Sequence, residues 1–198
     1  MVDLLAEYRA LRDKVDRFAT EVTEHRRADL ACRRGCSDCC RVELSLCPVE
    51  AEAVRQALGA LSAPQRAGLA AFQGACACLL PDGACAIYAH RPLVCRTQGL
   101  PLHYPEQLVP AAALRAAATA ARAFVCCPRN FTMREPDPAD ILDAQRVDVL
   151  LAVVNRRFAA QTGQDPLLRV PLRALVAEAR EAPEHEACSP QVQVHAAP

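Results

Sequence analysis

The sequence predicts a mainly α-helical fold, a small helical domain that frames a loop-rich, cysteine-bearing core. Apolar residues recur at helical spacing near both ends of the 198-residue chain, whereas the middle combines clustered cysteines with frequent proline and glycine. We therefore expect four parts: an N-terminal amphipathic helix over 1–28, the cysteine-cluster core over 29–135, C-terminal helices that pack on this core over 136–182, and a disordered tail over 183–198.

The first expected element is a long amphipathic helix. Apolar side chains from Leu4 to Val22 follow one another in alternating steps of four and three positions, which places them on one face of a helix. We expect this face to pack on the protein's own core. The alternative, a coiled-coil dimer, would need a repeat longer than about three heptads.

The middle of the chain predicts short helices and loops. Pro48 fits a first helical turn and indicates a helix over 48–58, and a second helix is expected over 64–72. Helix-breaking residues make 76–110 mostly loop. Within that stretch the Asp-Gly pair at 82–83 can close a tight hairpin, the one short β element that we expect.

Three helices are expected in the last part of the chain. The alanine-rich stretch 111–124 has high helix propensity. A helix over 139–160, capped by Asp137 or Asp140, is indicated by apolar residues on one face. These residues are Val147, Leu150, Leu151, Val154 and Phe158. A last helix starts near Pro171, and its predicted buried residues are Leu172, Leu175 and Val176.

Composition narrows the class of protein. The 23 basic and 23 acidic residues balance and are mixed along the chain, so we expect no nucleic-acid partner. No apolar run reaches membrane-spanning length, so we expect no membrane partner. The start of the chain lacks a basic segment followed by an apolar one, which favours a cytoplasmic location. Thiols stay reduced there, so dense cysteine favours metal or redox chemistry over the competing interpretation, a disulfide framework.

The strongest functional signal is an ordered cysteine array. It begins with Cys-x3-Cys-x2-Cys-Cys, formed by Cys32, Cys36, Cys39 and Cys40, and four thiolate donors within nine residues can converge on one point if the backbone loops around them. The array continues with Cys76 or Cys78, then Cys85, Cys95, and one of the pair Cys126 and Cys127.

The adjacent pair Cys39-Cys40 bears on the kind of metal site. Neighbouring side chains tend to diverge, so the two thiols suit different metal atoms better than one tetrahedral ion, which favours an iron–sulfur cluster over a single structural zinc. All-thiolate tetrahedral coordination nevertheless suits both metals. Arg91 and Arg96 are candidate cofactor-binding residues, because a guanidinium can neutralise thiolate charge and donate hydrogen bonds to sulfur. The competing interpretation of both arginines is a surface or turn role.

Three sequence segments together resemble a known family. They are the block from Cys32 to Cys40, the segment Cys85-Ala-Ile-Tyr-Ala-His-Arg-Pro-Leu-Val-Cys95-Arg96, and Cys127-Pro128-Arg129-Asn130-Phe131. The chain resembles the YkgJ-type cysteine-cluster family, the CxxCxxCC putative zinc- or iron-chelating domain, from about Cys32 to Phe131. In this sequence three residues, not two, separate Cys32 from Cys36.

The resemblance implies a set of metal ligands. The family places one cysteine about seven or eight residues before Cys85, a position that Cys76 and Cys78 straddle; we favour Cys76, because a loop absorbs an added residue more easily than a missing one. The Cys-x-x-Asn-Phe match favours Cys127. The predicted ligands are Cys32, Cys36, Cys39, Cys40, Cys76, Cys85, Cys95 and Cys127.

These observations predict a cytoplasmic metal-binding protein that holds an iron–sulfur cluster, with [4Fe–4S] preferred and zinc or iron as alternatives. Its role would be in redox chemistry, in metal handling or in assisting a protein or peptide partner. A second hypothesis, supported by the resemblance, is an iron–sulfur or iron-dependent enzyme that modifies a peptide or protein side chain. No phosphate loop, G-x-S-x-G or H-E-x-x-H motif is present, so no catalytic residue is assigned. The third hypothesis is a structural zinc module that binds a partner.

Overall fold

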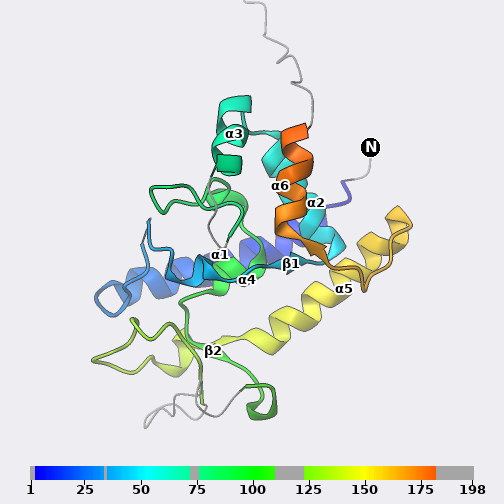
Figure 1. Cartoon of the computed structure of the whole chain (residues 1–198). Helices are drawn as coiled ribbons and strands as arrows, with labels where there is room; N and C mark the ends of the chain where they lie inside the picture. The colour runs from blue at the N-terminus through cyan, green and yellow to red at the C-terminus, as the bar shows by residue number, and fades with distance from the viewer. Residues whose placement is uncertain (1–2, 34, 72–75, 110–122, 182–198) are drawn as a thin grey trace, which may run out of the picture.

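The computed structural model describes residues 3–33, 35–71, 76–109 and 123–181 (Figure 1). The described part is mainly α-helical, as predicted. Its helices are α1 (Ala6–His25), α2 (Pro48–Gly59), α3 (Ala63–Ala71), α4 (Leu93–Thr97), α5 (Ala144–Thr162) and α6 (Leu172–Glu181). Its two-residue strands are β1 (Ser45–Leu46), β2 (Leu102–His103), β3 (Leu142–Asp143) and β4 (Val170–Pro171). None of these helices is long and apolar enough to span a bilayer.

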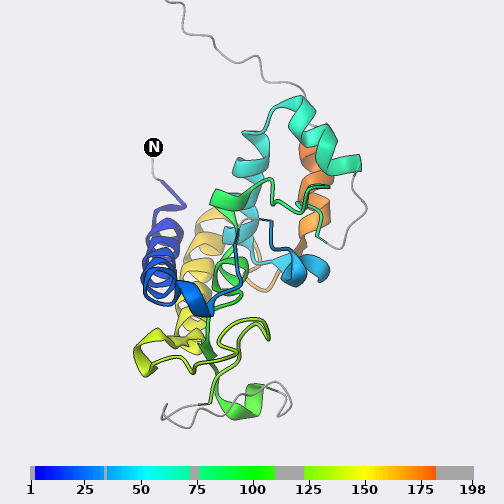
Figure 2. The ribbon, with the colours of Figure 1, turned by 90° about the vertical axis from the view of Figure 1, so that its left-hand side faces the viewer.

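The N-terminal helix packs on the core of the same chain. Tyr8, Leu11, Val15 and Val22 on one face of α1 are buried, as predicted. Leu4, the first residue of the predicted stripe, is 41% exposed and precedes the helix. This face contacts α4 and α5, and Figure 2 shows α1 and α5 side by side. Phe158 of α5 joins the same cluster of buried residues, so the first and last parts of the chain share one core.

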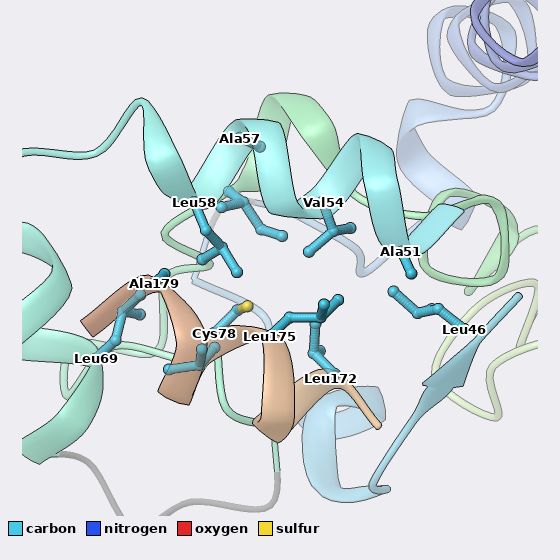
Figure 3. Packing of buried hydrophobic residues seen from close by; sticks show 12 residues of the cluster. Leu46, Ala51, Val54, Ala57, Leu58, Leu69, Cys78, Leu172, Leu175 and Ala179 are labelled. Carbon is cyan, nitrogen blue, oxygen red and sulfur yellow. The ribbon is translucent and has the colours of Figure 1, made fainter. Parts of the chain in front are cut away.

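A second core lies between α2, α3 and α6. Figure 3 shows side chains of α2 and α6 facing each other across this cluster. The pairing of β1 with β4 is antiparallel and brings the start of α6 beside the start of α2, and the Leu172 amide donates to the Leu44 carbonyl at 2.9 Å. Leu172, Leu175 and Val176 are buried, as predicted.

The helix predicted over 139–160 begins later than expected. A 3-10 turn over Pro138–Asp140 and strand β3 precede it, and β3 pairs in parallel with β2. The N-cap of α5 is Asp143, whose carboxylate accepts from the Arg146 amide at 3.0 Å. The prediction that Asp137 or Asp140 caps this helix was therefore wrong, because those two carboxylates cap the preceding 3-10 turn. Leu150 is also 41% exposed, so the predicted buried face is only partly buried.

The predicted hairpin is present, but its two arms pair through one isolated β-bridge. Leu79 and Cys85 form an antiparallel bridge, and the Leu80 amide donates to the Ala84 carbonyl at 2.8 Å. Gly83 has φ +79°, the left-handed conformation that glycine adopts at low cost in such a turn. The other strand pairs join residues far apart in sequence and were not predicted.

Some predicted elements lie partly or wholly outside the residues that the structure describes. Most of the helix expected over 111–124 lies outside them. At its described end the prediction was wrong, because Val125 exchanges two backbone hydrogen bonds with Leu102, and Phe124 also lies in a β-bridge. The last residue of the helix expected over 64–72 and the tail over 183–198 also lie outside the described residues.

Candidate metal centre

The first cysteine block folds as consecutive tight turns. The Cys36 amide donates to the Arg33 carbonyl at 2.9 Å, and the Cys40 amide donates to the Ser37 carbonyl at 2.9 Å. Gly35 has φ +86°, so glycine permits the reversal between them. Cys32 and Cys39 are exposed, whereas Cys36 and Cys40 are partly buried.

Asn130 fastens this block to two distant segments. Its Nδ2 donates to the Cys32 sulfur at 3.3 Å and to the Gly99 carbonyl at 2.7 Å, and its Oδ1 accepts from the Ala31 amide at 2.8 Å. The asparagine is fully buried. Gly99 has φ +93°, and a Cβ there would lie 2.5 Å from the Cys32 sulfur, so only glycine fits.

Cys127 lies in the same neighbourhood as Cys32. The backbone N–H of Asn130 donates to the Cys127 carbonyl at 3.0 Å, which closes a turn over residues 127–130. Burial raises the pKa of Cys32, the hydrogen bond from Asn130 lowers it, and the thiols of Cys127, Cys36 and Cys39 raise it further. By contrast, the Cys126 thiol donates to the Cys127 carbonyl at 3.3 Å, and Cys126 packs against an apolar cluster.

A second set of thiols surrounds the hairpin. Backbone N–H groups of Cys78 and Leu79 lower the pKa of Cys76 against the larger effect of burial. The Ile87 N–H does the same for Cys85. Such donors stabilise a thiolate, the form that binds metal.

Cys40 and Cys95 join this second set. Burial and then the thiols of Cys76 and Cys85 raise the pKa of Cys95 to about 12, against the lowering effect of the Arg91 charge. Burial, followed by Cys39 and then Cys76, raises the pKa of Cys40 to about 12. Thiolates so placed would repel one another unless a cation lay among them.

Cys76 and Cys78 have different surroundings. Cys78 is 1% exposed and sits between α2 and α6 in the apolar core, as Figure 3 shows. Burial is the main reason that its pKa is raised. Cys76 is only partly buried, and backbone N–H groups lower its pKa. A charged thiolate is therefore less costly at Cys76 than at Cys78.

The two candidate arginines occupy different positions. Arg96 is 8% exposed, and its Nη1 contacts both carboxylate oxygens of Asp16 in α1 at 2.6 Å. Its Nε and Nη2 donate to the Arg91 and Ala89 carbonyls at 2.6 and 2.5 Å. These contacts tie the loop before Cys95 to α1. Sequence reasoning did not identify Asp16, because no local pattern links it to the cysteines.

The charge of Arg91 acts on two of the cysteine thiols. Its guanidinium stacks over the Tyr88 ring, 3.8 Å from the centroid, and its Nε donates to the Tyr88 carbonyl at 3.2 Å. The Arg91 charge lowers the pKa of both Cys85 and Cys95, so it favours the thiolate form of these two side chains.

Beside Cys36 the surface is hollowed. Residues 35–38 line this hollow together with Ala31, Arg33 and Arg129. Arg129 also pairs with Asp38 at 2.6 Å, which joins the Cys127 loop to the first block. All eleven cysteines of the described residues are free thiols. In that part of the chain no three His, Cys, Asp or Glu side chains are placed to hold a metal ion.

Comparison with known proteins gives one finding. Residues 31–114 match the family model described as "CxxCxxCC: Putative zinc- or iron-chelating domain". No curated protein and no solved structure matches the chain. The matched stretch contains seven of the predicted ligands and ends before Cys127.

Proposed function

We propose that the cysteine array of this protein holds an iron–sulfur cluster, preferably [4Fe–4S], because residues 31–114 match the model of a putative zinc- or iron-chelating domain. The proposed ligands are the eight thiols predicted from the sequence: Cys32, Cys36, Cys39, Cys40, Cys76, Cys85, Cys95 and Cys127. Zinc or mononuclear iron is the alternative occupant, because tetrahedral thiolate sites accept these metals as well.

One observation carries this proposal: the turn after Cys127 contacts the first block of free thiols directly, and its side-chain amide donates to a sulfur of that block. The donor is Nδ2 of Asn130, 3.3 Å from the Cys32 sulfur, and backbone N–H groups lower the pKa of Cys76 and Cys85. Hydrogen bonds to sulfur favour the thiolate and raise the reduction potential of a cluster. Arg91 adds positive charge beside Cys85 and Cys95.

A bound iron–sulfur cluster would supply one-electron redox chemistry. We propose a cytoplasmic role in redox chemistry, metal handling or assistance to another protein. An enzyme that modifies a peptide or protein side chain is a second candidate, because the hollow beside Cys36 offers Arg33, Arg129 and Asp38 to a polar group. A structural zinc module is the third.

The test begins with protein purified without oxygen. Iron, zinc and acid-labile sulfide are measured per chain, and the visible spectrum is recorded before and after dithionite. Iron with matching sulfide and a bleachable visible absorbance supports the cluster. Stoichiometric zinc without colour replaces the cluster with a zinc module. Protein that contains neither metal, and that takes up neither on reconstitution, refutes the proposal.

A further inference from the structure

We propose that one face of α5 binds a partner protein, and that the partner contributes an amphipathic helix with an aliphatic stripe and acidic residues at both ends of that stripe. We call this surface the α5 face, and it consists of Arg146, Val149, Leu150, Val153 and Arg156. The α5 face lies outside the cysteine array in sequence, so this inference does not rest on the proposed metal-binding function.

Apolar residues occupy two different faces of α5. On the first face, Phe158 is buried and Val154 packs against the same cluster, which also includes residues of α1 and α2. On the second face, Val149, Leu150 and Val153 are 56%, 41% and 36% exposed. An α-helix turns about 100° per residue, so Val149 and Val153 lie on the side roughly opposite to Phe158. The second face therefore has no part in the core.

Local helix preference does not explain these exposed aliphatic residues. Valine is β-branched and is a poorer helix former than alanine, glutamate or arginine, which suit exposed helix positions. Exposed apolar area is also unfavourable in water. Residues three and four apart are neighbours on a helix surface, so Val149, Leu150 and Val153 form one continuous patch. A continuous apolar patch is typical of a surface that a partner covers.

An arginine lies at each end of this patch. Arg146 precedes Val149 by three positions and Arg156 follows Val153 by three, which places the two arginines about 15 Å apart along the helix axis. Both residues are exposed, and within the described part of the chain neither guanidinium forms an ion pair or a hydrogen bond. The nearby acid Asp148 lies about 140° around the helix from Val153. The α5 face therefore carries two positive charges that it does not itself neutralise.

The charge and the shape of the α5 face indicate the kind of partner. Two arginines on either side of an aliphatic patch are complementary to a segment with apolar side chains in its middle and carboxylates at both ends. Side chains spaced three and four apart form ridges that fit the grooves of a second helix, so a helical segment of about three turns suits this face. Its carboxylates would then meet Arg146 and Arg156.

The same charges argue against a second copy of this chain as the partner. An antiparallel pair of α5 helices centred between Val149 and Val153 would bring Arg146 of each copy beside Arg156 of the other. A parallel pair would bring each arginine beside its own equivalent. Like charges placed together across an interface oppose association, so both arrangements are disfavoured. We therefore assign the α5 face to a different protein.

Binding of two synthetic peptides to the full chain tests the inference. Both peptides are hydrocarbon-stapled helices with the same leucine stripe, and one carries glutamate at both ends of the stripe where the other carries lysine. In fluorescence anisotropy, the glutamate peptide should bind at least about tenfold more tightly, because two charge pairs replace two like-charge contacts. At about 1 M NaCl, where the Debye length is about 3 Å, this preference should shrink.

Variants of the full chain identify the residues responsible. Arg146→Glu/Arg156→Glu should reverse the preference, so that the lysine peptide binds more tightly. Val149→Gln/Val153→Gln should weaken the binding of both peptides about tenfold, since apolar contact is lost. The matched control is Met133→Gln, which removes an apolar side chain that is 94% exposed outside α5, and it should bind as wild type does. Far-UV circular dichroism should be the same for all variants, because every substituted residue is exposed.

Several results would overturn the inference. The full chain could bind neither peptide or both equally, or the variant with both arginines reversed could keep the wild-type preference. A full chain that sediments as a dimer, and as a monomer after Val149→Gln/Val153→Gln, would assign the face to a second copy. A tenfold gain in affinity for the glutamate peptide in Glu184→Gln/Glu186→Gln would assign it to the acidic residues after α6. None of these results bears on metal binding, which metal analysis tests separately.

Discussion

Replacing Asn130 with alanine should weaken both the fold and the metal centre. The side chain satisfies two backbone groups, the partly buried Ala31 amide and the buried Gly99 carbonyl, at 2.8 and 2.7 Å. Stranding a buried polar group costs about 1–3 kcal/mol, and a partly buried group costs less, so losing both hydrogen bonds should lower the free energy of unfolding by about 2–4 kcal/mol. For a chain of this size, each kcal/mol shifts the melting temperature by about 2–4 °C.

A matched control distinguishes loss of stability from loss of metal binding. Asn155 is also a buried asparagine that satisfies two backbone groups, accepting from the Val49 amide at 3.2 Å and donating to the Pro166 carbonyl at 2.9 Å. Asn155→Ala should therefore destabilise the protein by a similar amount. Asn155 contacts no cysteine through these bonds, so this variant should retain its metal.

The assay combines urea denaturation with metal analysis of the folded protein. Asn130→Ala should lose metal because the donor to the Cys32 sulfur is gone, whereas Asn155→Ala should not. The reasoning about Asn130 is refuted if both variants hold equal metal at equal stability. It is also refuted if Asn130→Ala unfolds at the same urea concentration as wild type.

Three further predictions concern other residues. Gly99→Ala should lower metal content and destabilise the protein by at least about 1 kcal/mol in urea denaturation, because φ is +93° and the new Cβ would lie 2.5 Å from the Cys32 sulfur. The control is Gly59→Ala, which should not destabilise the protein in the same assay, because a Cβ there meets nothing within 4 Å. Arg96→Ala should cost about 1.5–3 kcal/mol in a urea titration, since it removes a buried guanidinium that pairs with the exposed Asp16 and donates two hydrogen bonds to carbonyls. Arg157→Ala, at an exposed pair, should cost at most about 1 kcal/mol, and equal losses would contradict this difference. Burial raises the pKa of Glu50, so its contribution to stability is fully present below about pH 4.3, the unfolded value, and is lost as pH rises through the folded pKa. Wild type should therefore become less stable relative to Glu50→Gln between pH 4 and 7, and a constant difference across that range would rule this out.

Local patterns in the sequence were sufficient to predict most helices. The spacing of apolar residues in α1 and α6 and the proline at the start of α2 were correct guides, because helical hydrogen bonds join residues four apart and the buried face repeats with the same period. The Asp-Gly turn of the hairpin was predicted for a similar reason, since a tight turn depends on its own two residues.

The same local reasoning failed before α5, where several residues close in sequence could each cap the helix. Asp137, Asp140 and Asp143 are all acceptable helix caps, and the choice among them depends on β3 pairing with β2, some forty residues earlier in the chain. That pairing holds residues 142–143 extended and delays the start of α5. Nothing in the sequence of residues 137–143 indicates that β3 will pair with β2.

The sequence alone determined which residues can act as soft metal ligands, because the chemistry of a thiol and the spacing of the first block do not depend on the fold. Only the tertiary structure decided which thiols are neighbours, because Cys32 meets Asn130 across 98 positions of sequence. It also decided that Arg96 fastens α1 to the cysteine loop and that Arg91 lies near the sulfurs. Contacts between distant segments follow from how the helices pack, and a pattern within one segment cannot encode them.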